Sequence, residues 1–299
     1  MNRLLAVLGA LCISFSAIFI RLADVSPSTA AFFRTAYALP ILVVLWFVTG
    51  QRGTRSLRTR MLTVAAGLLI GISFTLWNHA IDMIGAGLST VLGNTQVVFV
   101  GLLAWVIYRE RPSNLAFLTI PIVFVGVALS SGLGRPESYG QQPVTGTIFS
   151  LINAVVYALY LIFFRSLSKR ASSPVGPVLD ASFGSFVMIT VLAVLTDDQF
   201  SLAFQWPAHF WLMCVALIAQ TLGWLLIATA LPRLPSLETS VILLLQPLLT
   251  VFWSYLIFRE VPSELQWLGV VLVLAGVGLL SIRGSVRTAA VTPATQSSS

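Results

Sequence analysis

Apolar residues in this chain form long blocks, separated by short connections that carry charges, glycines and prolines. A helix needs about 20 apolar residues to cross a hydrocarbon core of about 30 Å. We expect ten membrane-spanning helices, at 4–22, 28–49, 62–82, 87–108, 115–133, 144–167, 176–196, 208–231, 237–258 and 264–282. The pattern therefore predicts an all-α membrane protein.

A pattern of polar residues occurs twice, 150 residues apart. Its first copy is Gln96, Arg109, Glu110, Pro112, Ser113 and Gly126, and its second copy is Gln246, Arg259, Glu260, Pro262, Ser263 and Gly276. Two unrelated apolar segments would share Leu and Val rather than these residues. Residues 1–135 and 143–283 are thus predicted to be two five-helix repeats. Because five is an odd number, the second repeat crosses the bilayer inverted, and such repeats place a substrate site where they meet.

The basic residues predict the orientation of the chain. With the N-terminus in the cytoplasm, thirteen Lys and Arg residues fall on the inner side and three on the outer side, while Arg34 lies within a span. Cytoplasmic loops carry the excess of Lys and Arg, so both termini are predicted to be cytoplasmic in a multi-pass protein of the plasma (inner) membrane. Residues 284–299 have no apolar period, and we expect a disordered cytoplasmic tail.

Met1 to Ile20 also has the outline of a signal peptide, with a cleavage site at Ser14-Phe15-Ser16. Cleavage would remove the first span and leave the repeats unequal, so we expect the segment to be retained.

Composition excludes several classes of protein. The chain is 57% hydrophobic and 9% charged, against about 25% charged residues in soluble domains. The net charge of +7 comes from loop arginines without interleaved aromatic residues, so we expect no nucleic-acid partner. Cys12 and Cys214 both lie in apolar segments and indicate neither a zinc cluster nor a disulfide framework. Because no catalytic cluster, metal-ligand set or cofactor motif occurs, we expect no enzyme activity, no metal and no cofactor.

Several motifs resemble the drug/metabolite transporter superfamily, in particular its ten-helix EamA type, over about residues 4–282. They are Phe33-Arg34, Asn78-His79-Ala80-Ile81 with Gly85-Ala86-Gly87, and the doubled Glu-x-Pro-Ser at Glu110 and Glu260. The resemblance implies a monomeric bundle of two inverted repeats with a central cavity for small organic substrates. The family includes exporters of amino acids, among them the YddG-like aromatic amino-acid exporters.

Uncharged polar residues near the middle of the spans are the main candidates for substrate binding: Asn94, Gln96, Asn153, Tyr157, Gln220, Trp224 and Gln246. Amides bind ammonium and carboxylate groups, whereas aromatic rings pack against an apolar side chain, which suits a zwitterion. The alternative is that these amides only bridge helices, and the repetition of Gln96 as Gln246 is compatible with that purpose.

Ionisable residues at membrane depth are further candidates. Asn78, His79 and Asp82 crowd the end of the third span, where Asn78 and His79 are candidate substrate-binding residues and Asp82 has a possible gating or charge role. His79 could also couple transport to protons, or only bond a neighbouring helix. Arg34 either extends to the headgroups or caps a cavity and attracts a carboxylate. Asp180 has either a gating role or simple exposure at the inner interface. Glu110 and Glu260 are expected to pair locally with Arg109 and Arg259, and His209 to lie at the interface.

Together these features predict a secondary active transporter that exports a small organic metabolite by alternating access, with amino acids as the favoured substrate class. The alternatives are a multidrug or metabolite extruder and a facilitative, channel-like carrier. Expected partners are the substrate and the lipid bilayer.

Overall fold

The computed structural model describes residues 2–49, 55–109, 114–133, 138–168, 173–196, 199–230, 234 and 236–290. In these residues all regular structure is helical. The elements are α1 (Asn2–Ser14), α2 (Ser16–Ala23), α3 (Pro27–Val48), α4 (Leu57–Gly93), α5 (Gln96–Tyr108), α6 (Asn114–Ser130), α7 (Pro143–Ser168), α8 (Val175–Leu195), α9 (Ala208–Cys214), the π-helix η1 (Val215–Gly223), α10 (Trp224–Ala230), α11 (Ser236–Phe258) and α12 (Glu264–Ala290).

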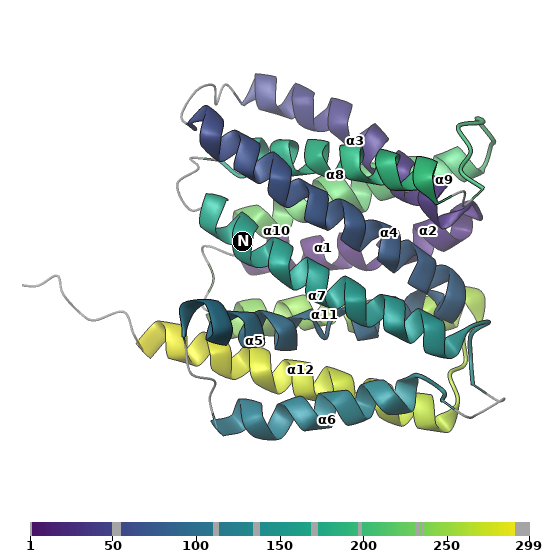
Figure 1. The fold of residues 1–299 in the computed structure, drawn as a ribbon, viewed down its shortest axis with the longest axis vertical. Helices are drawn as coiled ribbons and strands as arrows, with labels where there is room; N and C mark the ends of the chain where they lie inside the picture. Colours follow the sequence, from purple (N-terminus) through teal and green to yellow (C-terminus); the bar gives the residue numbers. More distant parts are fainter. Residues whose placement is uncertain are drawn as a thin grey trace, which may run out of the picture.

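The helices lie side by side in one bundle, with α3 and α8 along one edge and α6 and α12 along the other (Figure 1). Seven helical segments among the described residues are long and apolar enough to cross a membrane. Three shorter apolar helices are found at Gln96–Ile107, Leu115–Ser130 and Ile242–Phe258. The chain is thus an all-helical membrane protein, while ten crossings in two inverted repeats stay a prediction.

Large apolar side chains cover much of the exterior, for example Phe117, Leu118 and Val125 on α6. In water such a surface would be a liability, but lipid tails solvate it, and helices satisfy their own backbone hydrogen bonds there. The exterior therefore agrees with the bilayer as the solvent.

Three of the predicted spans are interrupted. The first is broken at Phe15 into α1 and α2, and the eighth is divided among α9, η1 and α10. The predicted third and fourth spans meet in α4, where Gly85 has a φ of 83°, and a second break follows at Asn94 and Thr95 before α5. Hydropathy separated the third and fourth spans near Gly85, but it did not reveal the breaks at Phe15, within the eighth span or at Asn94.

Close packing of α4 and α8 depends on glycines. A β-carbon on Gly67 would clash with the backbone of Ala181, and one on Gly184 with the carbonyl oxygen of Val64. Small residues allow two helix backbones to approach closely in membranes, where no hydrophobic force between helices assists. The Gly67-x-x-x-Gly71 motif is therefore a packing surface.

The helices α6 and α12 pack antiparallel. Gly126 lies against Gly269, and Val123 lies against Gly276, so the contact positions advance in opposite directions along the two helices. The start of α12 carries a capping box in which Ser263 N donates to Gln266 Oε1 (3.0 Å) and Gln266 N donates to Ser263 Oγ (3.4 Å). Helix α12 continues to Ala290, past the predicted start of the tail at residue 284, and residues 291–299 lie outside the described chain.

Candidate functional site

A cavity of about 330 Å³ lies inside the bundle and is lined from both predicted repeats. Its walls come from α1, α2, α3, α4 and α5 and from α7, α10, α11 and α12. The polar lining residues, tyrosine included, are Ser16, Arg34, Ser73, Thr90, Asn94, Gln96, Asn153, Tyr157, Gln246 and Ser281. The volume falls within the range of about 300–1,000 Å³ that is typical of small-molecule sites.

Helix breaks bring several of these polar groups to the cavity. Asn94 caps α4, where its Nδ2 donates to the Thr90 carbonyl (2.8 Å), and Gln96 begins α5 just after the break. Ser16 begins α2 just after the break at Phe15. Non-helical backbone at membrane depth is tolerated where it is buried in protein or lines a cavity, and broken helices commonly form transporter sites.

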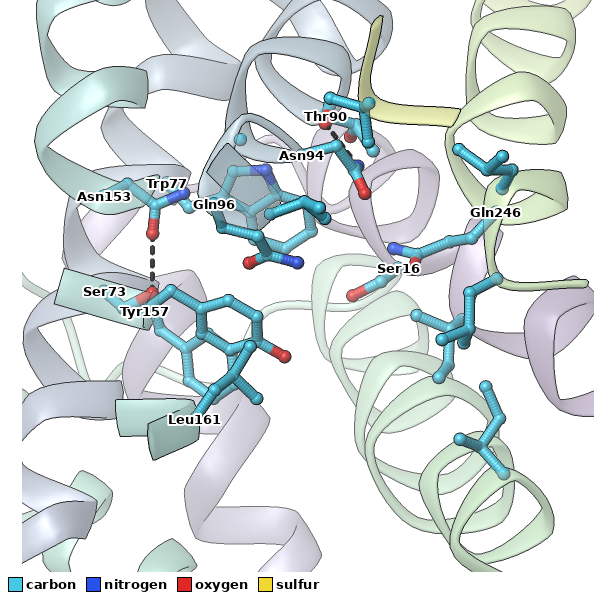
Figure 2. Close-up of a pocket in the computed structure, with 18 of the residues that line it drawn as sticks. Ser16, Ser73, Trp77, Thr90, Asn94, Gln96, Asn153, Tyr157, Leu161 and Gln246 are labelled. Carbon is cyan, nitrogen blue, oxygen red and sulfur yellow. Dashed lines mark hydrogen bonds between the residues drawn. The ribbon is translucent and has the colours of Figure 1, made fainter. Parts of the chain in front are cut away.

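One wall of the cavity is held by contacts between α4 and α7. Ser73 Oγ donates to Asn153 Oδ1 (2.5 Å), and Tyr157 lies one turn further along α7. Figure 2 shows Asn153, Gln96 and Tyr157 on one side of the space and Ser16 and Gln246 on the other. Amide and hydroxyl groups thus face each other across the cavity.

Arg34 is the basic residue of this lining. Its side chain is buried, with 3% of its surface exposed, and its Nε donates to Gln220 Oε1 (2.9 Å). The guanidinium carbon lies 3.9 Å from the centre of the Phe74 ring and 5.5 Å from that of Trp77. Arg34 therefore does not extend to the headgroups, which removes one of the two alternatives drawn from the sequence.

Gln220 and Trp224 have different places, although both were predicted to line the cavity. Trp224, at the start of α10, lines it. Gln220 lies within the π-helix η1 outside the lining and reaches the cavity through its bond to Arg34. π-helical turns often occur at functional positions. Gln220 lies in such a turn and supports Arg34 through its hydrogen bond to Nε.

The polar cluster on the third predicted span lies outside the cavity lining. Asn78 Nδ2 donates to the Pro27 carbonyl (3.2 Å), and His79 Nδ1 lies 2.8 Å from the Thr75 carbonyl oxygen of its own helix. Asp82 is exposed. The His79 ring also lies 5.8 Å from that of Phe149 on α7, and none of the three residues is among those that line the cavity.

Asp180 is not exposed at an interface, in contrast to one of the two alternatives drawn from the sequence. It is 5% exposed, and its carboxylate pairs with Arg55 Nη2 (2.8 Å) and Arg60 Nη2 (3.5 Å). The pair borders a second hollow between α3, α4 and α8, lined largely by apolar residues. Asp180 thus joins α8 to the start of α4 and takes no part in the central cavity.

Glu260 makes a long-range contact that the sequence did not predict. Its buried carboxylate accepts hydrogen bonds from Ala86 N (2.9 Å) and Gly87 N (3.1 Å) and forms an ion pair with Arg21. The expected pairing with Arg259 is therefore wrong for Glu260, while Glu110 lies outside the described residues. Gly85 at φ 83° turns the backbone so that the new helical segment presents its free N–H groups to the carboxylate.

Aromatic rings stack beside α2, the helix that carries Arg21. Phe15 stacks on Trp253 (4.9 Å between ring centres) and on Phe19 (5.5 Å), and Phe19 stacks on Trp211 (5.9 Å). Along α2 the chain passes from Ser16 in the cavity through Phe19 to Arg21. We call Phe15, Phe19, Trp211, Trp253, Arg21 and Glu260 together the seal.

At the other end of the bundle the lining continues. It passes from Tyr157 to Leu161 on α7 and from Val277 to Ser281 on α12, toward the C-terminal parts of these helices. The two ends of the cavity thus differ, because the seal residues follow Ser16 along α2 at one end and lining residues of α7 and α12 continue at the other.

His209 is buried rather than interfacial. Its Nδ1 lies 2.5 Å from the Tyr37 hydroxyl and its Nε2 3.1 Å from the Ala203 carbonyl oxygen. Phe33 and Phe204 also contact the imidazole, each at 4.5 Å between ring centres. These contacts fix α9 against α3 and lie outside the cavity.

Comparison with protein-family models finds a match that is repeated along the chain. The model of the EamA-like transporter family matches residues 3–132 and again residues 144–282.

Curated relatives are similarly named. An uncharacterized transporter of Synechocystis sp. is 25% identical over 73% of this chain, and the match spans 65% of that relative's own length. The uncharacterized transporter YvbV of Bacillus subtilis is 25% identical over 76% of this chain and 73% of its own. An uncharacterized transporter of Archaeoglobus fulgidus is 23% identical over 90% of this chain and 93% of its own.

A solved crystal structure shares the fold. It superposes with a TM-score of 0.63 at 11% sequence identity, and the match covers 96% of this chain and 98% of the other.

Proposed function

Since this chain belongs to the EamA-like transporter family, within the drug/metabolite transporter superfamily, we propose that it is a secondary carrier that exports a small organic metabolite by alternating access. Membership of this family makes it a transporter and not an enzyme. Amino acids are the proposed substrate class, and a monomer in the plasma (inner) membrane with cytoplasmic termini is the proposed form.

The central cavity is the observation that carries this proposal. Residues of both predicted repeats line it, and its polar groups are mostly uncharged amides and hydroxyls among aromatic and aliphatic walls. Asn94, Gln96, Asn153, Tyr157, Trp224 and Gln246 are the proposed substrate-binding residues. This lining suits an amphipathic molecule that offers hydrogen-bonding groups at one end and an apolar body at the other.

Alternating access is supported by the two unlike ends of the cavity. The seal includes Arg21 and Glu260, which the charge distribution predicts to lie on the outer side, so a seal that closes this end would make the described conformation inward-facing. The antiparallel pairing of α6 and α12, which end the two predicted repeats, favours the inverted arrangement. Inverted repeats allow the two halves to exchange conformations around a fixed site.

The two alternatives are less well supported. A multidrug extruder of aromatic cations would use an acidic residue in its cavity, and no Asp or Glu is found among the described residues that line this one. A channel needs a continuous open passage, and the close contacts among the seal residues argue against one in this conformation.

Reconstitution into liposomes tests the proposal. We expect a labelled amino acid to accumulate in vesicles that are preloaded with the same unlabelled compound, because a carrier exchanges its substrate across the membrane. Unsaturable flux without such counterflow would indicate a channel. Exchange of a phosphorylated sugar without exchange of any amino acid would contradict the substrate class.

A further inference from the structure

Arg34 carries a buried positive charge with a neutral hydrogen-bonding partner. Its Nε is bonded to the uncharged amide of Gln220, and its Nη1 is buried without a hydrogen-bond partner among the described residues. The Phe74 and Trp77 rings attract the cation, but they provide neither a negative charge nor a lone pair. A buried charge without a paired counterion is costly, so this position favours an anion that enters with the substrate.

Both acidic side chains that are buried in the described part of the chain are paired elsewhere. Glu260 binds Arg21 and two backbone N–H groups in the seal, and Asp180 binds Arg55 and Arg60 beside α8. Within the described part of the chain, no acidic residue lines the cavity. The cavity consequently has a formal charge of +1 that originates from Arg34.

On these grounds we propose that Arg34 anchors a substrate carboxylate, and that the cavity selects organic monocarboxylates with an apolar body, for which an ammonium group is dispensable. The guanidinium is a planar fork that matches a carboxylate, and such charge-assisted bonds are roughly twice as strong as neutral ones. An ammonium group would find neutral acceptors such as Gln96 and Gln246 and repulsion from Arg34.

The rest of the lining determines the shape of the substrate. Trp77, Trp224, Leu161 and Ile227 provide apolar and aromatic walls beside the charged position. A phosphate ester carries up to about two negative charges on three oxygens, and one guanidinium neutralises it incompletely. A single carboxylate on an aromatic or aliphatic body matches both the charge and the walls.

This inference rests on the proposed function, since it assigns a substrate chemistry to the proposed transport cavity. Four compounds that share a benzyl group test it. They are L-phenylalanine, 3-phenylpropionate, L-phenylalaninamide and phenethylamine. Binding to the purified full-length protein in detergent is measured by calorimetry, and exchange is measured in proteoliposomes. We expect the two carboxylates to bind with similar affinity, and the two amines to bind about ten- to a hundredfold more weakly, as for the loss of a charge-assisted bond.

Variants at Arg34 and Gln220 separate anchoring from folding. Arg34→Gln should abolish the preference for carboxylates, whereas Arg34→Lys should retain part of it. Gln220→Glu places a carboxylate where the amide now lies 2.9 Å from Nε. This built-in counterion should suppress binding of 3-phenylpropionate at least tenfold while the protein unfolds at an unchanged or higher temperature. Arg58→Gln changes an exposed arginine far from the cavity lining and serves as the control.

The outcomes distinguish this inference from the proposed function. Exchange of the amines without binding of the carboxylates would overturn the anchor and leave the carrier in place. Binding of the carboxylates without exchange would retain the anchor and contradict the carrier. Binding of none of the four compounds, or an undiminished carboxylate preference in Arg34→Gln, would overturn the anchor.

Discussion

At the scale of single residues, Asn153 illustrates how a polar group is prepared for binding within a membrane. Its Oδ1 accepts a short bond from Ser73, which fixes the amide on the cavity wall. A side chain that is already ordered loses less conformational entropy when a substrate binds. Asn153 is therefore better suited to recognition than a freely rotating amide.

We expect Asn153→Ala to weaken substrate binding by about fivefold, since one net hydrogen bond contributes about 1 kcal/mol. The measurement is the half-saturating concentration for counterflow. Ser150→Ala is the matched control, because Ser150 lies one turn earlier on α7 and its hydroxyl is buried without a hydrogen-bond partner among the described residues. Equal effects of the two changes would mean that Asn153 only supports helix packing.

His79→Ala is expected to leave the pH profile of transport unchanged between about pH 6 and pH 8, the range in which a histidine ordinarily titrates. The reason is geometric, since His79 lies outside the cavity lining and contacts a carbonyl of its own helix. The rate of counterflow at several pH values checks this. A flattened profile in the variant would restore the proton-coupling interpretation.

The types of residue in the sequence predicted more of the residues that line the cavity than of the contacts in the seal. Asn94, Asn153 and Tyr157 were selected because they are polar at mid-span, and the cavity is lined by them. Glu260 was assigned to Arg259 because the two are adjacent in sequence, whereas the folded chain provides Arg21 and two backbone donors. Partners more than 170 positions away leave no local signal.

At the scale of elements, the broken helix α4 joins the seal to the cavity. At Gly85 a new helical segment begins within α4, and Glu260 accepts hydrogen bonds from the first N–H groups of this segment. The segment ends at Asn94, which lines the cavity. A movement of this short helical segment would therefore act on both regions. The glycines at 85 and 87 were the available sequence signal for such a start.

Glu260→Gln is expected to loosen the seal, because it removes the charge that pairs with Arg21 and one of the two acceptors for the N–H groups of α4. A single cysteine introduced at Ser254, in a background without Cys12 and Cys214, reports this change through its rate of modification by a thiol reagent added from the Glu260 side. We expect labelling about tenfold faster than in the parent protein, as for a shift of about 1.4 kcal/mol toward the open state.

Glu264→Gln is the control for this experiment, since Glu264 is exposed four residues further along the chain. Labelling of Glu260→Gln at the rate of the parent would show that the aromatic rings alone close this end.

At the scale of the whole molecule, α4 and α8 form one of the closest contacts of the bundle. We expect Gly67→Ala to destabilise the protein by about 1–3 kcal/mol, because the added carbon would meet the backbone of Ala181. Thermal unfolding in detergent measures the effect. At Gly101 an added carbon meets no atom within 4 Å, so Gly101→Ala should be neutral or slightly stabilising. Equal shifts would contradict the close contact.

Reporter fusions test the overall topology. A green fluorescent protein fused after Ser299 should fluoresce, and an alkaline phosphatase at the same position should be inactive, because the positive-inside rule predicts a cytoplasmic C-terminus. The reverse pattern would invert the assignment of the seal to the outer side.

The sequence predicted the class of fold well, because twenty-residue apolar blocks and a 150-residue repeat have few structural interpretations. It separated the chain near Gly85 but did not predict the breaks at Phe15, within the eighth span or at Asn94. A break within a membrane depends on neighbouring groups that satisfy the free backbone, as Glu260 does for Ala86 and Gly87, and these neighbours come from distant parts of the chain.

Trp77 and Trp224 both border the central cavity, and this gives the protein a built-in optical reporter. Indole emission shifts toward the blue when water around the ring is replaced by an apolar molecule. Filling of the cavity should thus be visible in the unlabelled protein, without a radioactive compound or an attached dye.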